Sequence, residues 1–275
     1  MSSKTPADTH ESPLAAPSKL GQRLFLGFLG TVGGLYVVLV CYHAYVISQP
    51  KEIPFAEKMG LLEECRQVCM KYGLLTTGHI KNDANSYLDK VGAKRLSEDL
   101  ALILSDKSFQ PVATQPHPLL GKPAPEFELL DVDGKQQTLS QIRGHGPAIV
   151  VFYYGYGCSH CVAQLFGLQK DLQHFRELGV PIVAISPDTP EHTAEKYKEY
   201  GAFSFPVLSD PENKAATAYG TFVAATDATQ ETMVHGTFLI SPEGTIEWTN
   251  TGNEPFVDNK SLLLRMAEVT GAWSP

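Results

Sequence analysis

The sequence contains few cysteines and few basic residues. Five cysteines in 275 residues are too few for a fold held together by disulfides, so their positions are more informative than their number. Lys and Arg total 22 against 30 Asp and Glu, which gives a net charge of -8. Nucleic-acid binding needs a basic surface, so we expect no nucleic-acid partner. The apolar fraction of 43% is ordinary, which excludes wholesale disorder and a protein with many membrane spans.

One long apolar run, residues 24–47, contains no Asp, Glu, Lys or Arg. About 20 apolar residues cross a bilayer as a helix, so the run predicts a single-pass anchor in the lipid bilayer. The alternative is a cleaved signal peptide, but the run is longer than usual for one and no A-x-A pattern follows it. Lys19 and Arg23 precede the run and Lys51 follows it, which slightly favours a cytoplasmic N-terminus and an extracytoplasmic (periplasmic-side) catalytic domain.

Composition divides the chain into five parts. They are a disordered tail (1–23), the anchor (24–47), a helical segment (48–110), a proline-rich linker (111–120) and an α/β domain (121–275). Five prolines between residues 111 and 125 predict a semi-rigid linker and a domain boundary. Within the helical segment, apolar residues spaced 3-4-3 along residues 62–72 and a second stretch over 85–104 predict two helices.

Beyond the linker, apolar strands alternate with helical stretches. Continuous apolar runs at 148–154 and 181–186 predict buried strands, and turn residues predict hairpins at 127–139 and 237–250. Helices are predicted at 159–178, 188–201, 214–219 and 259–269. Parallel β-α-β units followed by an antiparallel hairpin indicate an α/β fold with a central mixed sheet flanked by helices.

A C-x-x-C motif, Cys158 and Cys161, lies between a predicted strand and its helix. A thiolate at a helix N-terminus is stabilised by unpaired N–H groups, so we expect Cys158 to have a lowered pKa and to attack disulfides. His160 would lower that pKa further when protonated and would favour the reduced form. Cys161 begins the apolar stripe of the helix, which predicts an exposed attacking Cys158 and a shielded resolving Cys161.

Two other interpretations of the C-x-x-C motif are a structural disulfide and half of a zinc site. The sequence has no second C-x-x-C and no close His pair that would complete a metal set. Thiol–disulfide exchange therefore remains the favoured chemistry for this motif.

Three stretches in order resemble the AhpC/TSA (redoxin) family, over residues 121–252. GKPAPEFELLDVDGK is similar to its opening, IVVFYYGYGCSHC to its active-site strand and loop, and GTFLISPEGTI to its closing hairpin. The resemblance implies a thioredoxin-like fold and an oxidoreductase that needs no cofactor. The family includes peroxiredoxins, which have antioxidant activity, and membrane-anchored thiol–disulfide reductases. Its redox partners would be protein thiols or disulfides, or small thiols.

The chain departs from the active-site pattern of the peroxiredoxins and from that of the thiol–disulfide reductases. Peroxiredoxins carry Pro-x-x-x-Thr/Ser-x-x-Cys, and the corresponding residues here are Val151 and Gly155. His235 lies where their active-site Arg is expected. Without these groups a peroxide loses positioning and electrostatic assistance. Thiol–disulfide reductases usually place a cis-proline near the same position, and this chain has no proline between Pro211 and Pro242.

His235 also keeps a copper-binding hypothesis open. Copper-delivery proteins of cytochrome oxidase assembly share the fold and bind metal through two cysteines and a histidine, a donor set that suits Cu(I). Their cysteines are spaced C-x-x-x-C, whereas Cys158 and Cys161 are spaced C-x-x-C. Tyr156, His235 and Gly236 are further candidates for substrate contact.

Two more cysteines, Cys65 and Cys69, could relay electrons to Cys158. Both lie on the apolar stripe of their predicted helix, where cysteine behaves as a small buried hydrophobe. The sequence as a whole predicts a membrane-anchored thiol–disulfide oxidoreductase in which Cys158 attacks, Cys161 resolves and His160 tunes. The alternatives are a thiol peroxidase and a copper-binding assembly chaperone.

Overall fold

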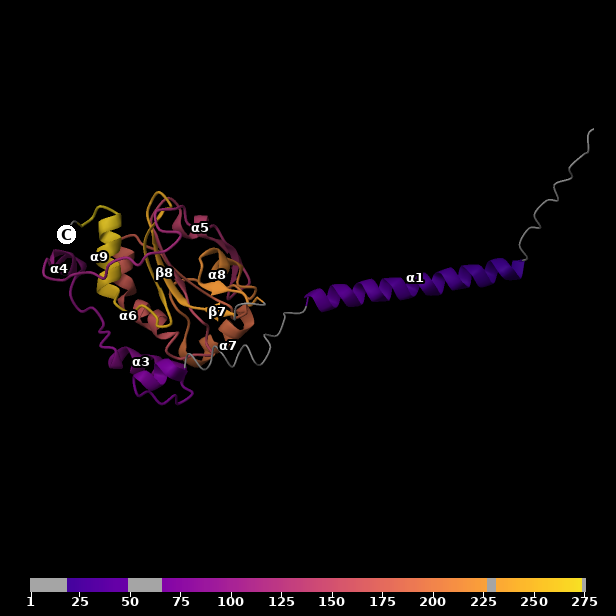
Figure 1. Ribbon diagram of the computed structural model, residues 1–275, viewed down its shortest axis with the longest axis horizontal. Coiled ribbons are helices and arrows are strands. Elements are labelled where there is room, and N and C mark those ends of the chain that lie inside the picture. Colours follow the sequence, from indigo (N-terminus) through magenta and orange to yellow (C-terminus); the bar gives the residue numbers. More distant parts are fainter. Residues whose placement is uncertain (1–18, 49–65, 227–230, 274–275) are drawn as a thin grey trace, which may run out of the picture. The chain divides into compact units, whose positions relative to one another are not determined.

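The computed structural model describes residues 19–48, 66–226 and 231–273. The chain forms two compact units, Met1–Glu52 and Ile53–Pro275. The first unit contains the helix α1 (Lys19–Ser48), which begins five residues before the predicted anchor (Figure 1). Within it, Leu26–Tyr45 is long and apolar enough to cross a membrane, and no part of this stretch is buried. Some signal sequences near the N-terminus also meet this criterion of length and composition.

A seven-stranded mixed sheet forms the centre of the second unit, in the order β2-β1-β5-β4-β3-β8-β9. Its strands are β1 (Glu128–Asp131), β2 (Gln136–Thr138), β3 (Ala148–Phe152), β4 (Ile182–Ser186), β5 (Val207–Ser209), β8 (His235–Ile240) and β9 (Ile246–Gly252). Strands β3, β4 and β5 run parallel, and β8 is antiparallel to β3. A separate two-stranded ribbon pairs β6 (Phe222–Val223) with β7 (Thr232–Met233).

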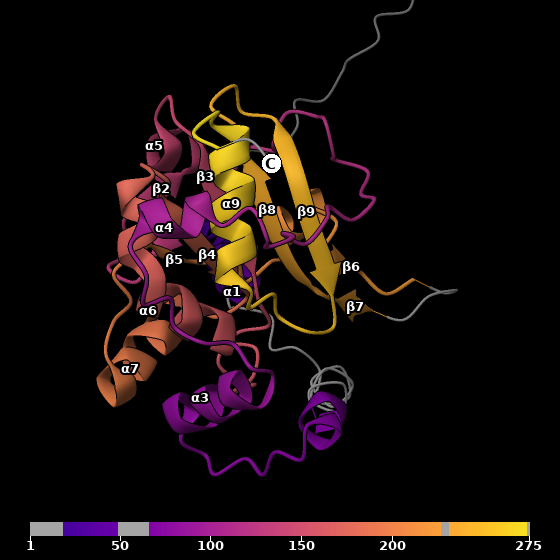
Figure 2. The same cartoon turned by 90° about the vertical axis from the view of Figure 1, so that its left-hand side faces the viewer.

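Helices cover both faces of this sheet (Figure 2). They are α3 (Ile80–Lys90), α4 (Leu100–Ser105), α5 (Leu139–Arg143), α6 (Ala163–Glu177), α7 (Pro190–Tyr200), α8 (Lys214–Ala218) and α9 (Asn259–Val269). Side chains alternate along β3, so Ile149 and Val151 pack with α3, α6 and α9, whereas Val150 and Phe152 pack with α5 and α8. Every residue of β3 and β4 is buried, as their continuous apolar runs predict.

Local signals in the sequence fix several element boundaries. Thr138 and Gln141 form a capping box at the start of α5. Thr189 caps α7, which has a proline in its first turn. Gly134 and Gly244 have φ of 74° and 88° in the two hairpin turns, a backbone region that favours glycine. Both predicted hairpins and the predicted helix at 259–269 are therefore confirmed.

The predicted single helix over 85–104 is wrong. The structure has two helices there, because α3 ends at Lys90 and Gly92 adopts a φ of 74°. The connection to α4 is held against α6, where the Leu96 N–H donates to the Asp171 carboxylate at 2.9 Å. A glycine in the left-handed region ends the first helix, and this contact fixes the direction of the chain after it.

The proline-rich linker packs along the edge strand β9 rather than between two separate bodies. The Gln115 N–H donates to the Thr249 carbonyl at 2.9 Å, and the Trp248 indole donates to the Val112 carbonyl at 3.0 Å. Arg265 on α9 donates to the carbonyls of Val112 at 3.0 Å and Pro111 at 2.9 Å. The expected domain boundary at 111–120 thus lies inside one compact unit, Ile53–Pro275.

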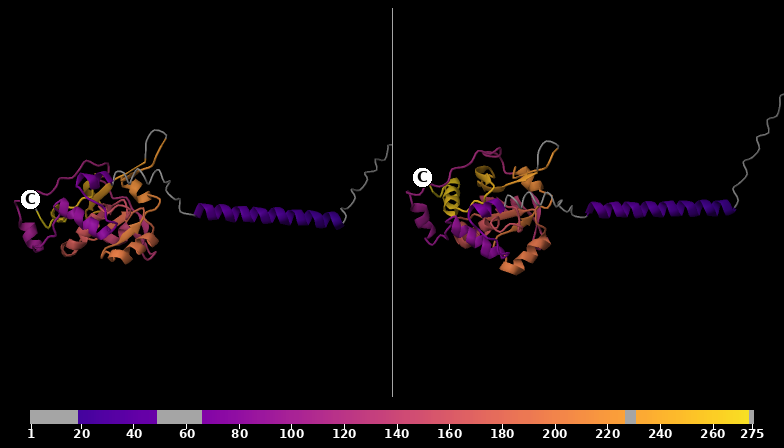
Figure 3. Two further views of the ribbon diagram at one scale, coloured as in Figure 1. Left: turned by 90° about the horizontal axis from the view of Figure 1, so that it is seen from below. Right: turned by 60° about the horizontal axis from the view of Figure 1, so that its bottom comes forward.

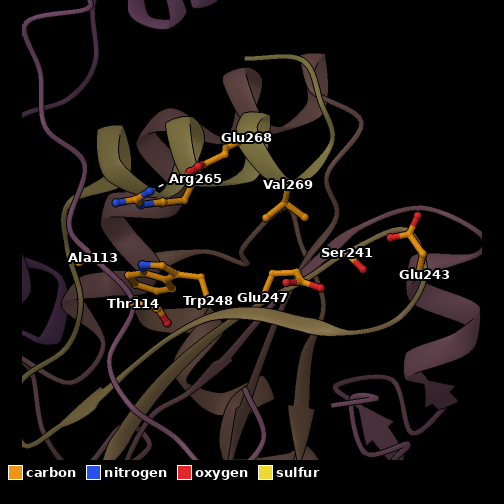
Figure 4. Close-up of a pocket in the computed structure, with 9 residues that line it drawn as sticks. All are labelled: Ala113, Thr114, Ser241, Glu243, Glu247, Trp248, Arg265, Glu268 and Val269. Atoms are coloured by element: carbon orange, nitrogen blue, oxygen red, sulfur yellow. Dashed lines mark hydrogen bonds and ion pairs between the residues drawn. The ribbon is translucent and has the colours of Figure 1, made fainter. Parts of the chain in front are cut away.

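A pocket of about 480 Å³ remains between this linker, β9 and α9 (Figure 4). Ser241, which lines it, follows the end of β8 opposite to His235. This pocket therefore belongs to the end of the sheet away from the C-x-x-C motif, which follows the opposite end of β3.

Candidate active site

The C-x-x-C motif forms a pair of turns between β3 and α6. The Cys161 N–H donates to the Cys158 carbonyl at 3.1 Å, and the Ala163 N–H donates to the His160 carbonyl at 3.0 Å. The helix α6 begins at Ala163, four residues later than predicted. Both cysteines therefore lie in the turns that lead into the helix, at the carboxyl end of a parallel strand.

His160 lies between the two thiols of the motif. Its Nδ1 is 2.9 Å from the Cys158 Sγ, and its Nε2 is 3.6 Å from the same sulfur. The Cys161 Sγ is 3.7 Å from Nε2. The ring can therefore stabilise a thiolate on either cysteine and accept or return its proton.

The predicted exposure of Cys158 is wrong. Cys158 is 6% exposed and Cys161 is 0% exposed, and His160 is buried with them. Residues 66–105, named here the covering segment, pack against this histidine. Its Tyr87 ring lies 5.6 Å from the His160 ring, and Tyr72 packs edge-on against Tyr87. Burial raises the pKa of Tyr87 well above its usual value, so the phenol stays neutral.

The covering segment also brings a third cysteine to the site. Residues 66–71 are helical, and the Sγ of Cys69 lies 3.6 Å from the Nδ1 of His160. The sequence placed Cys69 on a buried stripe and offered it as an electron relay to Cys158, but it did not indicate the contact with His160. Cys65, the other candidate relay, lies outside the described residues.

A pocket of about 640 Å³ opens beside Cys158, between the covering segment and the active-site loop. Its walls include Cys69, Cys158, Met70, Leu74, Ile80 and Tyr156. Helix α3 supplies Ile80 to the wall of this pocket and packs against α6 (Figure 3). Of the three predicted substrate contacts, Tyr156 lines this pocket, whereas His235 and Gly236 lie at the start of β8 and are not part of its lining.

His235 is buried and carries no positive charge at neutral pH. Its ring packs 4.6 Å from Tyr154 and 6.3 Å from His160. Burial, and then repulsion from His160, lowers the pKa of His235 well below its usual value. It therefore cannot replace the cationic group that the resemblance assigns to peroxiredoxins at this position.

Gly236 lets β8 approach its neighbours closely. A Cβ at this position would lie 2.5 Å from the Thr221 methyl and 2.8 Å from the Phe238 ring. The residue therefore has a packing role in the described structure.

Gly155 lies against a buried carboxylate that the sequence analysis missed. Its φ is 92°, and a Cβ built on it would overlap the Asp188 carboxyl group. Asp188 accepts the Tyr156 N–H at 2.8 Å and so fixes the loop before Cys158. Burial raises the pKa of Asp188. Asp188 follows β4, and the carboxyl ends of adjacent parallel strands meet at one edge, so strand order could have indicated it.

Three groups in the described structure could together hold a metal ion. The ligand atoms of Cys158, His160 and Cys161 lie within 4.8 Å of one another. Two thiolates and an imidazole suit a soft ion such as Cu(I). This set uses His160 within the motif rather than the His235 of the copper-binding hypothesis.

Comparison with known proteins identifies the family. Residues 120–249 match the AhpC/TSA family. A Mycobacterium tuberculosis (strain CDC 1551 / Oshkosh) protein named as a peroxiredoxin, MT2597, is 33% identical over 128 residues, 46% of this chain and 80% of that protein. The chain belongs to the AhpC/TSA family.

Two further proteins are similar to this chain. The thiol-disulfide oxidoreductase ResA of Bacillus subtilis (strain 168) is 29% identical over 154 residues, 55% of this chain and 79% of ResA. Among solved structures, peroxidoxin BcpB of Mycobacterium tuberculosis is 22% identical with a TM-score of 0.47, and the match covers 54% of this chain and 97% of BcpB. The predicted family, the thioredoxin-like fold class and the oxidoreductase class are thus confirmed. The covering segment lies outside the family match.

Proposed function

We propose that this protein is a membrane-anchored thiol–disulfide oxidoreductase whose reactive dithiol is Cys158 and Cys161. One observation supports this most directly. The Cys158 Sγ lies on the wall of a pocket and 2.9 Å from His160 Nδ1, while Cys161 is fully buried in the same turn. A reachable attacking thiol next to a base, with a shielded thiol behind it, is the arrangement that disulfide exchange requires.

The exchange proceeds in two steps. The Cys158 thiolate attacks one sulfur of a substrate disulfide, the substrate S–S bond breaks, and one substrate thiolate leaves and is protonated. The Cys161 thiolate then attacks the Cys158 Sγ of the mixed disulfide and releases the second substrate thiol. The substrate is reduced by two electrons and the dithiol is oxidised to a disulfide; the reverse sequence oxidises a substrate dithiol.

The substrate class is a protein thiol or disulfide, or a small thiol. The apolar side chains of Met70, Leu74 and Ile80 beside Cys158 suit the apolar residues that flank a protein cysteine. Lys196 and Arg66 also line this pocket and provide positive charge for the carboxylates of a small thiol such as glutathione.

A thiol peroxidase is the second candidate, supported by the relative named as a peroxiredoxin. The site does not favour it. Val151 is fully buried in β3, Gly155 faces the Asp188 carboxyl group, and His235 is neutral, so none of these residues orients or polarises a peroxide. A copper-binding chaperone is a third candidate, supported only by the closeness of Cys158, His160 and Cys161.

The proposed enzyme has a single-pass membrane anchor and an extracytoplasmic catalytic domain. The apolar helix Leu26–Tyr45 supports a single-pass anchor, and Lys19 and Arg23 before it favour a cytoplasmic N-terminus. Residues 53–275 would then lie on the extracytoplasmic side, where disulfides persist. A C-terminal alkaline phosphatase fusion in a bacterial host should be active, and an inactive fusion would place the domain in the cytoplasm.

The test of the activity uses the full chain in detergent with oxidised glutathione as substrate and dithiothreitol as reductant. Turnover should fall at least 100-fold in Cys158→Ser and remain unchanged in Cys41→Ser, which removes a thiol of the anchor helix. Peroxide should be consumed slowly. Fast, saturable turnover of hydrogen peroxide would make the peroxidase the better assignment, and stoichiometric Cu(I) binding lost in His160→Ala would support the chaperone.

A further inference from the structure

We propose that Cys69 is a second resolving thiol for Cys158, an inference that rests on the proposed disulfide exchange. The Cys69 Sγ is 3.6 Å from the Nδ1 of His160, and the same nitrogen is 2.9 Å from the Cys158 Sγ. Two thiols from segments 89 residues apart in sequence therefore share one imidazole nitrogen. Both line the pocket beside the active-site loop.

Cys69 and Cys161 take different positions around Cys158. Cys161 faces the other ring nitrogen, Nε2, at 3.7 Å and is 0% exposed, whereas Cys69 is 7% exposed and borders the pocket. A substrate that forms a mixed disulfide with Cys158 in this pocket therefore has the Cys69 thiol on the pocket wall, whereas the Cys161 thiol is buried in the active-site loop. Cys69 is the thiol on the side from which the substrate leaves.

The surroundings of Cys69 differ from those of a cysteine that only fills a core. Its neighbour in the chain, Val68, belongs to the main apolar core together with Tyr87 and Leu88. Cys69 itself lies outside the apolar clusters of the described structure, and its sulfur faces an imidazole nitrogen. A polar partner for a buried sulfur indicates thiol chemistry rather than packing.

The Cys69 thiol gives its proton to the Nδ1 of His160, and the Cys69 thiolate attacks the Cys158 Sγ of the mixed disulfide. The bond between Cys158 and the substrate breaks, and the substrate leaves as a thiolate that takes the proton from His160. Cys69 and Cys158 end as a disulfide, and the substrate has received two electrons. A later attack of the Cys161 thiolate on Cys158 transfers the disulfide to the C-x-x-C motif and restores the Cys69 thiol.

The experiment uses the full chain in detergent and oxidised glutathione as the probe, with Cys41→Ser as the common background. Cys161→Ser removes the resolving thiol of the proposed function, and Cys161→Ser/Cys69→Ser removes both resolving thiols with almost no change in side-chain size. The reduced proteins are mixed with the probe, quenched with acid and digested by trypsin without reduction. Cleavage after Arg66 and Lys71 gives peptide 67–71, which carries Cys69 without Cys65, and Cys158 lies in peptide 144–170.

In Cys161→Ser we expect peptide 67–71 linked to peptide 144–170, with the glutathione adduct on Cys158 short-lived. In the double variant the link is absent and the adduct should persist at least tenfold longer. A persistent adduct in Cys161→Ser, or a link through the Cys65 peptide 59–66 in place of 67–71, would overturn the role of Cys69 while leaving the proposed function intact. A Cys158 that never forms an adduct in any variant contradicts the proposed function, and the role of Cys69 with it.

Discussion

The family domain and the covering segment meet at the thiols but are built in different ways. The family domain, residues 120–249, holds Cys158 and Cys161 at the end of a sheet whose central strands are wholly buried. The covering segment consists of short helices and turns, and many of its side chains are exposed. It nevertheless supplies Cys69 and Tyr87, which contact the buried imidazole between the thiols. The two thiols and the imidazole of the motif therefore come from the family domain, and a segment outside the family match adds contacts to the imidazole.

Removing the main contact of the covering segment should have the largest effect. Tyr87 is fully buried against His160 and Tyr72, so Tyr87→Ala should lower the free energy of unfolding by about 3–5 kcal/mol. Alkylation of Cys158 by iodoacetamide should become faster, because the variant uncovers the thiols. Denaturant unfolding and peptide mapping of the alkylated chain measure the two effects.

The control for that variant is Tyr219→Ala, which empties the core on the other face of the sheet. It should cost a similar free energy and leave the alkylation rate of the folded protein unchanged. Equal acceleration in both variants would show that general loosening, and not the covering segment, determines access to Cys158.

The loop of the family domain should tolerate a side chain at Gly155 poorly. Gly155→Ala forces an L residue to a φ of 92° and brings a Cβ onto the Asp188 carboxyl group, so we expect a loss of about 2 kcal/mol or more. Gly134→Ala is the matched control, because its φ is 74° and nothing lies within 4 Å of the added Cβ. The control should lose about 1 kcal/mol. Equal losses in urea unfolding would mean that Asp188 does not hold the loop.

Acid should destabilise the protein through His235, which the family domain buries. The folded pKa of His235 is lowered, so only the unfolded chain takes up this proton as the pH falls below 6.5. The stability that the neutral, buried His235 contributes is fully present above pH 6.5 and is lost as the pH falls. The free energy of unfolding then decreases with a slope approaching about 1.4 kcal/mol per pH unit. His235→Gln should remove that part of the slope between pH 6.5 and 5. Unfolding curves of both proteins with the same pH slope would contradict the burial of a neutral imidazole.

The smallest loss of stability is expected from a substitution that weakens the contact between the linker and α9. Arg265 donates to the carbonyls of Pro111 and Val112, so Arg265→Leu should lower the free energy of unfolding by about 1 kcal/mol. The alkylation rate of Cys158 should stay the same, since Arg265 lies beside the pocket at the opposite end of the sheet (Figure 4). A faster rate would indicate that the linker, rather than contacts such as Tyr87, holds the covering segment in place.

Most of the domain could be predicted from the sequence because its signals are local. Strands β3 and β4 follow from continuous apolar runs, and α9 begins at Asn259 as its pattern indicates. The positions of the two cysteines after β3 follow from the same reasoning. The shielding of Cys161 follows as well, but the burial of Cys158 could not be predicted, because the covering segment meets the motif through contacts such as that between residues 69 and 160, which are 91 positions apart. The broken helix at Gly92 and the Asp188 carboxylate beside Gly155 likewise depend on packing between elements.

The placement of the two tryptophans has a consequence for measuring the redox energetics. Trp248 lies on β9 and Trp273 packs beside Leu178, after the end of α6 that is remote from Cys161. A helix of 15 residues spans about 22 Å, so the intrinsic fluorescence of Trp273 should report unfolding with the same signal in the dithiol and disulfide forms. Denaturant titrations of the two forms then close a thermodynamic cycle. The difference between their unfolding free energies equals the shift in reduction potential that folding imposes on the cysteines, with about 1.4 kcal/mol corresponding to 30 mV.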